Sequence, residues 1–379
     1  MRNEYIHIAS FAGNIGDLIN HQGFYSSFEL EEKNIKKIEM RRFYRNCREG
    51  KLEFDENLTD EINRAKALIV GGGGFFDVYW NESNTGTTLN MSKKFIDSIR
   101  VPVIVNAMGF HVDRTKTEAI KKFYKFFCYI KEKPNWYISI RNDGSGKRLQ
   151  ELYGCGILDG LNIVPDNGFM IKNKVKCSGV PIDKTIGFNL TNELIDLKYT
   201  NGISAEYFNS EISKLILNFL KKDYCCIFFL HTPQDITTLI KIMNQIGAEK
   251  FRNNIVIAPY LPFDISGGLE DFLYYYSKCK LVIGMRFHAN VACIASNIPV
   301  IGLSIHEQIS DMYDEIELSE YCVRVGEYDW IAKLRRKISF IAENQENERN
   351  AQCHVMDNII ADYDKYKKNV LKFVKYNCI

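Results

Sequence analysis

The sequence predicts an α/β protein built from two doubly wound, Rossmann-like domains that face each other across a cleft. Three observations support this fold class. The sequence contains short apolar runs in which apolar and polar residues do not alternate, which is typical of strands buried on both faces of a parallel sheet. Each run ends in a glycine or polar turn and is followed by a helical stretch. The pattern also occurs twice along the 379 residues, which suits two domains of ordinary size.

The N-terminal domain is predicted to span residues 1–175. Its expected elements are, in order, the strands Tyr5–Ala12, Ala67–Val70 and Val101–Ala107, the helix Thr115–Ile130 and the strand Trp136–Ile140. The polar stretch 171–183 contains Gly179 and Pro181, and we predict that it links the two domains.

The C-terminal domain is predicted to span residues 183–330. Its expected strands are Thr185–Leu190, Cys225–Leu230, Ile255–Ala258, Lys280–Met285 and Val300–Leu303. Its expected helices are Ala205–Leu220, Ile236–Ile246, Leu269–Ser277 and Ala289–Ala295. The charged segment 331–379 is predicted to be helical. Whether it packs back on the N-terminal domain stays open. Ligands of such folds bind beyond the carboxyl ends of the strands, at the point where the strand order reverses.

Composition argues against several classes of protein. Lys and Arg number 49 and Asp and Glu 47, and the resulting net charge of +2 gives no support to a nucleic-acid partner. The 11 cysteines include no CxxC pair, so we expect reduced, mostly buried thiols rather than a zinc site or disulfide framework. No apolar run approaches the roughly 18–20 residues of a membrane span, and no signal-peptide core is visible. We therefore expect a cytosolic protein.

The segment from Lys280 to Asn290 places an arginine and a histidine where a strand gives way to a helix. Arg286 and His288 lie two residues apart at this turn. A helix N-terminus favours an anion, and a guanidinium adds a planar fork for phosphate or carboxylate. An imidazole there can move a proton near neutral pH. A surface arginine beside a capping histidine explains these residues equally well.

Arg141 ends another predicted strand and is followed by Asn142, Asp143, Gly144 and Ser145. It either points into the cleft from the other domain or lies solvated on a turn. Two arginines on opposite sides of a cleft would suit a small, multiply charged anion.

Two glycine-rich turns also follow predicted strands. Gly71–Gly74 allows a tight turn and close approach of a ligand, but matches neither common nucleotide-binding fingerprint. In Gly13–Asp17, Asp17 is either a helix N-cap or a ligand to sugar hydroxyls. Phe75, directly after the tetraglycine, is a candidate to stack on a sugar ring.

In this order, the segments resemble the polysaccharide pyruvyl transferase family. The matching pieces are Gly13-Asn-Ile-Gly-Asp17, Gly71–Gly74 with Phe75, Ser139-Ile-Arg141, Val164-Pro-Asp166, and Arg286-Phe-His288 with Ala292 and Pro299 beyond it. The resemblance runs from about residue 10 to about residue 320.

The resemblance implies a GT-B-like fold and transfer of an enolpyruvyl-derived group from phosphoenolpyruvate to a sugar, giving a cyclic pyruvate ketal on a cell-surface glycan or its precursor. It places the donor pocket on Arg141, Arg286, Phe287 and His288, with Arg286 and His288 also catalytic. We expect the acceptor side on strand ends of the N-terminal domain, at Asn14, Asp17, Gly73, Gly74 and Phe75. No cofactor is expected, because phosphoenolpyruvate is a co-substrate. No metal cluster is visible in the sequence and the reaction does not strictly need a metal, but assistance by a divalent ion stays open.

Two other functions stay open on the sequence alone. A GT-B glycosyltransferase could hold the diphosphate of a nucleotide sugar on the same arginine and helix N-terminus. A non-catalytic sugar-binding relative is also compatible, because Asn142 and the segment His306-Glu307-Gln308 depart from the family pattern. The expected partners are phosphoenolpyruvate and a sugar or lipid-linked glycan. Peripheral association with the inner face of the membrane stays open, and the sequence does not fix the oligomeric state.

Overall fold

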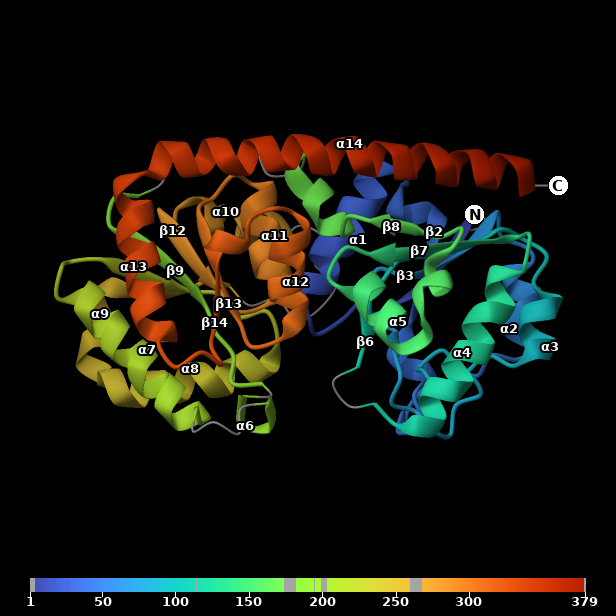
Figure 1. Ribbon diagram of the computed structural model, residues 1–379, viewed down its shortest axis with the longest axis horizontal. Coiled ribbons are helices and arrows are strands. Elements are labelled where there is room, and N and C mark those ends of the chain that lie inside the picture. Colours follow the sequence, from blue (N-terminus) through green and yellow to red (C-terminus); the bar gives the residue numbers. More distant parts are fainter. Residues whose placement is uncertain are drawn as a thin grey trace. The chain divides into compact units, whose positions relative to one another are not determined.

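Two six-stranded parallel sheets flanked by helices organise the computed structural model (Figure 1). The structure describes residues 4–112, 115–173, 182–193, 195–198, 203–259 and 268–377. Contacts within the chain divide it into unit 1, which holds Met1–Phe11, Phe24–Asn167 and Ile360–Ile379, and unit 2, which holds Ala12–Gly23 and Gly168–Ile359. This division differs from the predicted domains in two places, because residues 12–23 and residues 168–173, all predicted in the N-terminal domain, fall in unit 2. Residues 360–379 fall in unit 1, the arrangement that the sequence leaves open for the end of the charged segment.

Unit 1 is built on a sheet with the strand order β2-β1-β3-β5-β7-β8. Its strands are β1 (Tyr5–Ala9), β2 (Ile35–Glu39), β3 (Ala67–Gly71), β5 (Val103–Met108), β7 (Trp136–Arg141) and β8 (Asn162–Val164), beside a ribbon of β4 (Phe76–Asp77) and β6 (Phe110–His111). Its helices are α2 (Glu56–Ile62), α3 (Lys93–Ser98), α4 (Thr117–Lys131) and α5 (Ser145–Tyr153), with the ends of α1 (Ile15–Ser27) and α14 (Gln345–Asn377). Strands β3 and β5 are buried along their whole length, as their unbroken apolar runs predict.

Unit 2 is built on a second sheet with the strand order β11-β10-β9-β12-β13-β14. Its strands are β9 (Thr185–Asn189), β10 (Cys225–Phe228), β11 (Ile255–Ile257), β12 (Leu281–Gly284), β13 (Val300–Ser304) and β14 (Cys322–Arg324). Its helices include α6 (Ile195–Lys198), α7 (Ala205–Leu220), α8 (Pro233–Ile246), α9 (Phe251–Asn254), α10 (Gly268–Ser277), α11 (Phe287–Ala295), α12 (Glu307–Glu315) and α13 (Trp330–Glu343). All the strands and helices predicted from the sequence are confirmed, with ends that differ by a few residues.

Each sheet has one point where the strand order reverses. In unit 2 the chain moves outward from β9 to β10 and β11, and then returns to add β12 on the other side of β9. In unit 1 the same reversal separates β1 from β3. The loops that leave neighbouring strands diverge at such points and open a crevice beyond their carboxyl ends. The loops after β9 and β12, and those after β1 and β3, are therefore where ligands are expected.

The sequence does not predict the short strands β4 and β6, nor three strands of the two six-stranded sheets, which all lie at sheet edges: β2, β8 and β14. Strand β2 reads Ile-Lys-Lys-Ile-Glu, and Ile163 in β8 is 50% exposed. Edge strands carry exposed and charged residues, so a search for apolar runs does not detect them.

Several other expectations have a structural outcome. The nine described cysteines are free thiols, but only three of them are buried. The predicted linker lies mostly outside the described residues, which resume at residue 182. The segment after residue 330 is helical, and its end belongs to unit 1, where the Tyr363 hydroxyl donates to Asn167 Oδ1 over 2.7 Å and Tyr366 to Asn106 Oδ1 over 2.8 Å. No described helix is both long enough and apolar enough to cross a membrane.

Candidate active site

Arg286 lies at the reversal point of the unit 2 sheet, between the end of β12 and the start of α11. Its backbone N–H donates to Asn189 Oδ1 over 2.8 Å, and the N–H of Met285 donates to the Asn189 carbonyl over 2.9 Å. Asn189 is fully buried at the end of β9. One asparagine thus ties together the two strand ends, β9 and β12, beyond which ligands of such folds bind.

The Arg286 guanidinium has one buried and one exposed carboxylate partner. Its Nε and Nη2 donate to Asp235 Oδ1 over 3.1 and 2.6 Å, and its Nη1 donates to Glu193 Oε2 over 2.6 Å. The Asp235 side chain is fully buried, whereas that of Glu193 is 44% exposed. Burial by itself lowers the pKa of Arg286, but Asp235 and Glu193 outweigh it and raise that pKa. Asp235 therefore holds the Arg286 guanidinium in place as a cation. Glu193 occupies the Nη1 edge of the guanidinium, which an anionic ligand can take.

Asp235 is itself held by the start of α8. Thr232 and Asp235 form a capping box around Pro233, the first residue of the helix. Asp235 Oδ2 accepts the backbone N–H groups of His231 over 2.9 Å and of Thr232 over 3.1 Å. The sequence analysis does not predict Asp235 as a site residue, although the pattern Thr-Pro-Gln-Asp after a strand is the local signal of such a cap. Asn189, Thr191 and Glu193, which also contact Arg286, carry no such signal.

His288 lies in the first turn of α11 and is 9% exposed. The start of α1 packs directly against it, because a Cβ atom on Gly16 would lie 2.6 Å from His288 Nδ1. Asn14 caps α1 by accepting the Gly16 N–H over 2.9 Å, so the alternative in which Asp17 is the N-cap is wrong. The positive ends of two helices, α1 and α11, thus meet at this imidazole.

His231 lies beside this group and is fully buried. Its Nε2 shares a hydrogen bond of 2.9 Å with the Tyr276 hydroxyl, and its carbonyl accepts the Ile15 N–H over 2.9 Å. Burial, with smaller contributions from His288 and Arg286, lowers the pKa of His231 well below 6.5. His231 is therefore neutral at pH 7 and adds no positive charge next to Arg286.

In unit 1, Arg141 lies at the end of β7 and is only 2% exposed. Its Nε donates to Asp143 Oδ2 over 2.7 Å and its Nη1 to Asp166 Oδ2 over 3.1 Å. Burial opposes the charge, but the two aspartates outweigh it and raise the pKa of Arg141. Burial likewise acts to raise the pKa of Asp143, and Arg141 is the largest influence that lowers it below its usual value. The alternative in which Arg141 lies solvated on a turn is wrong.

The tetraglycine forms the turn after β3 in unit 1. Gly71 and Gly72 have φ angles of +114° and +83°, which residues with a Cβ atom rarely adopt. Gly74 lies against the imidazole of His111, which leaves no room for a Cβ atom. Phe75 is 7% exposed and packs in the hydrophobic core of unit 1. The acceptor roles expected for Gly73, Gly74 and Phe75 stay predictions.

Comparison with known families places the chain. The model of the family described as polysaccharide pyruvyl transferase matches residues 15–307. The chain belongs to this family. The match covers Gly16, Arg141, Arg286 and His288, and it makes the protein a transferase that acts on polysaccharide. No curated protein matches the sequence closely enough to count as a relative.

Solved structures show that the chain has the GT-B-type fold expected from the sequence. A glycosyltransferase from Rickettsia africae is 13% identical, with a TM-score of 0.58 and a match that covers 99% of each chain. A UDP-GlcNAc 2-epimerase from Neisseria meningitidis is 10% identical, with a TM-score of 0.52 over 94% of this chain and 99% of the other. MnaA of S. aureus is 12% identical, with a TM-score of 0.51 over 97% of each chain. At these identities the likeness concerns the fold alone.

Among the residues that the structure describes, no group of three or more His, Cys, Asp or Glu side chains is placed to hold a metal ion.

Proposed function

We propose that this protein transfers the pyruvyl group of phosphoenolpyruvate to two hydroxyls of one sugar in a polysaccharide or its lipid-linked precursor, forming a cyclic ketal. The observation that carries the proposal is the pairing of Arg286 with His288 at the start of α11, where the start of α1 packs against His288. Phosphoenolpyruvate is a small anion with a phosphate and a carboxylate, and two helix N-termini beside an arginine suit it.

Arg286 is the proposed phosphate-binding residue. Asp235 holds Nε and Nη2, so the guanidinium keeps its orientation when Nη1 changes partner. The donor phosphate would replace Glu193 at Nη1, because that carboxylate is the exposed one of the pair. A fixed cation at the leaving group stabilises the charge that develops there without having to move during the reaction.

His288 is the proposed proton-transfer residue. In the overall reaction a proton adds to C3 of phosphoenolpyruvate, two sugar oxygens bond to C2, and the bond from C2 to the phosphate oxygen breaks. Of the two hydroxyl protons, one ends in the new methyl group and the other on the released phosphate. An imidazole can pass protons between hydroxyl and carbon, whereas Arg286 cannot give up its proton near neutral pH.

The structure favours a positioning role for Arg141 over the donor contact that the resemblance implies. Its guanidinium is bound by Asp143 and Asp166, and both carboxylates are fully buried. A donor anion would have to displace a buried aspartate, which leaves that charge unpaired at high cost. Asn14 and Asp17 remain proposed acceptor residues, now on the same unit as His288. The proposed compartment is the cytoplasm, at the inner face of the membrane when the acceptor is lipid-linked.

The test is a reaction of purified protein with phosphoenolpyruvate and candidate glycans. Release of phosphate, together with a glycan that gains one pyruvate minus one water, is the expected result. Binding is checked independently by the melting temperature, which phosphoenolpyruvate should raise and UDP-GlcNAc should not. A shift caused by UDP-GlcNAc alone would overturn the proposal in favour of a nucleotide-sugar enzyme. Binding of glycan with no response to either donor would identify a sugar-binding protein instead.

A further inference from the structure

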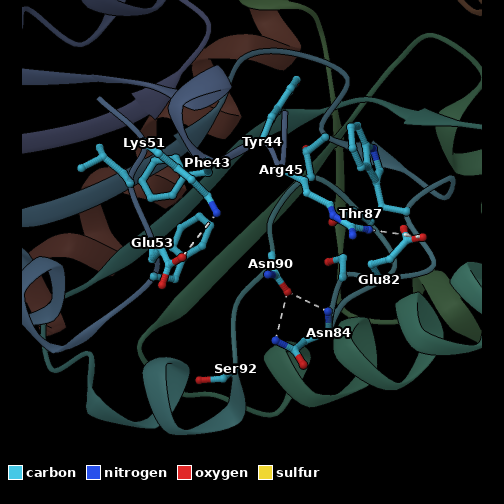
Figure 2. Close-up of a pocket in the computed structure, with 15 residues that line it drawn as sticks. Phe43, Tyr44, Arg45, Lys51, Glu53, Glu82, Asn84, Thr87, Asn90 and Ser92 are labelled. Atoms are coloured by element: carbon cyan, nitrogen blue, oxygen red, sulfur yellow. Dashed lines mark hydrogen bonds and ion pairs between the residues drawn. The ribbon is translucent and has the colours of Figure 1, made fainter. Parts of the chain in front are cut away.

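Unit 1 contains a pocket that none of the residues considered so far lines. Its volume is about 410 Å³, within the range of roughly 300–1,000 Å³ typical of small-molecule sites. Two segments form it: residues 43–54, which follow β2, and residues 80–92, which follow β4. Figure 2 shows the side chains of both segments that line the pocket.

Aromatic rings provide the apolar part of the wall. Phe43 and Phe54 are stacked with ring centres 4.2 Å apart, and Tyr44 is tilted against Trp80 at 5.4 Å. Tyr44 and Trp80 are half-buried, so part of each ring faces outward. The indole Nε1 of Trp80 is buried and has no hydrogen-bond partner, so a small turn of the ring would offer a ligand one more donor. Such rings bind the apolar face of a molecule that is polar at its edges.

Amides and hydroxyls provide the polar part. Asn90 Oδ1 accepts the backbone N–H of Asn84 over 2.8 Å and its Nδ2 over 3.0 Å, as Figure 2 shows. This pairing orients both amides and leaves Asn84 Oδ1 and Asn90 Nδ2 as an acceptor and a donor at the exposed rim. Hydroxyl groups of a ligand can both donate and accept, so they match such a mixed pair.

The charged side chains around the pocket neutralise one another. Arg45 faces Glu82 at 3.8 Å, and Lys51 faces Glu53 at 3.5 Å. Two cations and two anions leave no net charge to attract a phosphate or carboxylate. The balance favours a neutral ligand over a nucleotide or an acidic sugar.

We propose that this pocket binds a neutral sugar residue of the acceptor glycan. The aromatic faces suit the carbon side of a pyranose ring, and the amides suit its hydroxyls. Thr88 in the pocket wall donates to the Phe75 carbonyl over 3.3 Å, so the pocket adjoins the tetraglycine turn at the carboxyl edge of the unit 1 sheet. The identity of the glycan as the acceptor rests on the proposed function, whereas binding of a neutral sugar does not.

Tryptophan fluorescence tests the pocket without any need for catalysis. The chain has three tryptophans, and Trp136 and Trp330 are buried outside the pocket, at 8% and 0% exposure. The probes are neutral mono- and oligosaccharides of glucose, galactose, mannose and N-acetylglucosamine, with glucuronate and UDP as charged comparisons. A saturable change with a neutral sugar is expected, and Trp80→Phe should abolish it.

The affinity for that sugar is then measured by calorimetry in amide variants. Asn84→Ala and Asn90→Ala should each weaken binding about fivefold, the usual effect of one neutral hydrogen bond. Asn57→Ala, at an exposed asparagine on α2, is the matched control and should bind as the wild type does. Circular dichroism spectra that match the wild type establish that the variants are folded.

The outcomes separate the pocket from the reaction. Neutral sugar binding that the amide variants weaken supports the pocket even in a protein that does not use phosphoenolpyruvate. Ketal formation with a glycan KM unchanged in Asn84→Ala and Asn90→Ala overturns the pocket while the proposed function stands. Binding of UDP or glucuronate in preference to every neutral sugar also overturns it.

Discussion

The two units each place an arginine at the end of a parallel strand, yet the surroundings of the two arginines differ. Arg141 in unit 1 is bound by Asp143 and Asp166, and both carboxylates are fully buried. Arg286 in unit 2 forms ion pairs with buried Asp235 and with half-exposed Glu193. Arg141 thus lies in a closed ion-pair group, whereas Arg286 has one exchangeable edge. Position at a strand end therefore does not by itself leave an arginine with an edge that a ligand can take; the exposure of its carboxylate partners decides this.

Each arginine also has a histidine nearby, and these histidines differ in the same way. His111 in unit 1 lies against Gly74, and its charge helps to lower the pKa of Asp143. His288 in unit 2 lies where two helix N-termini meet, beside the arginine with the exchangeable edge. We therefore expect Arg141 and His111 of unit 1 to have a structural role, and Arg286 and His288 of unit 2 to act on the donor.

The largest expected effect tests the histidines. His288→Gln should lower kcat about 10²–10⁴-fold, the usual effect of losing general acid–base catalysis, with little change in KM for phosphoenolpyruvate. The measurement is steady-state release of phosphate. His111→Gln is the matched variant in unit 1 and should reduce kcat far less. Equal losses in the two variants would remove the distinction between the units.

Arg141→Ala should act on stability. Asp143 and Asp166 would remain as buried charges without their cation, and breaking a buried ion pair costs about 3–5 kcal/mol of the free energy of unfolding. Urea unfolding followed by the fluorescence of Trp136, at the start of β7, reports on this region. An Arg141→Ala protein with unchanged stability and much weaker phosphoenolpyruvate binding would restore Arg141 as a donor residue.

Arg286→Ala should act on binding. Loss of a charge-assisted hydrogen bond is expected to weaken the affinity for phosphoenolpyruvate by about 1.5–3 kcal/mol, measured by calorimetry. Arg286→Lys should recover only part of this, because a point charge does not replace a planar fork. The same affinity in Arg286→Ala and the wild type would contradict the assignment.

His231 should make the free energy of unfolding of unit 2 depend on pH in the mildly acidic range. Its pKa in the folded protein lies well below 6.5, so the unfolded chain binds the proton more tightly. The stabilisation is complete above pH 6.5 and is lost as the pH falls, by about 1.4 kcal/mol per pH unit within the window down to the folded pKa. Unfolding at pH 7 and 5.5 should show this slope in the wild type and a smaller one in His231→Gln. Equal slopes would assign the dependence to other groups.

The sequence predicts the interior of the fold better than its rim. Central strands such as β3 and β5 are buried on both faces and read as unbroken apolar runs, whereas the edge strand β2 carries two lysines and is missed. The start of α1 shows another limit. Local patterns reveal a glycine-rich turn after β1, but its place against His288 depends on residues more than 250 positions later in the chain.

For the candidate site, too, the sequence predicts the residues of one local segment but not their partners from elsewhere in the chain. Arg286 and His288 are visible because a strand, a turn and a helix follow one another within one short segment. Their partners Asn189, Glu193 and Asp235 come from the ends of two other strands, and only the order of strands in the sheet brings them together. The burial of Arg141 was likewise hidden, because its partner Asp166 follows an edge strand that the sequence does not reveal.

The smallest expected effect tests the exchangeable edge of Arg286. Glu193→Gln removes the charge that competes with the donor and leaves Asp235 in place. Half-exposed ion pairs contribute about 0.2–1 kcal/mol, so the affinity for phosphoenolpyruvate should rise by up to about fivefold, with stability almost unchanged. Glu206→Gln, at an exposed glutamate in the first turn of α7, controls for the general change in charge. Tighter binding in Glu193→Gln alone would establish that this carboxylate occupies the place of the donor, whereas weaker binding would mean that it helps to orient Arg286 toward the donor.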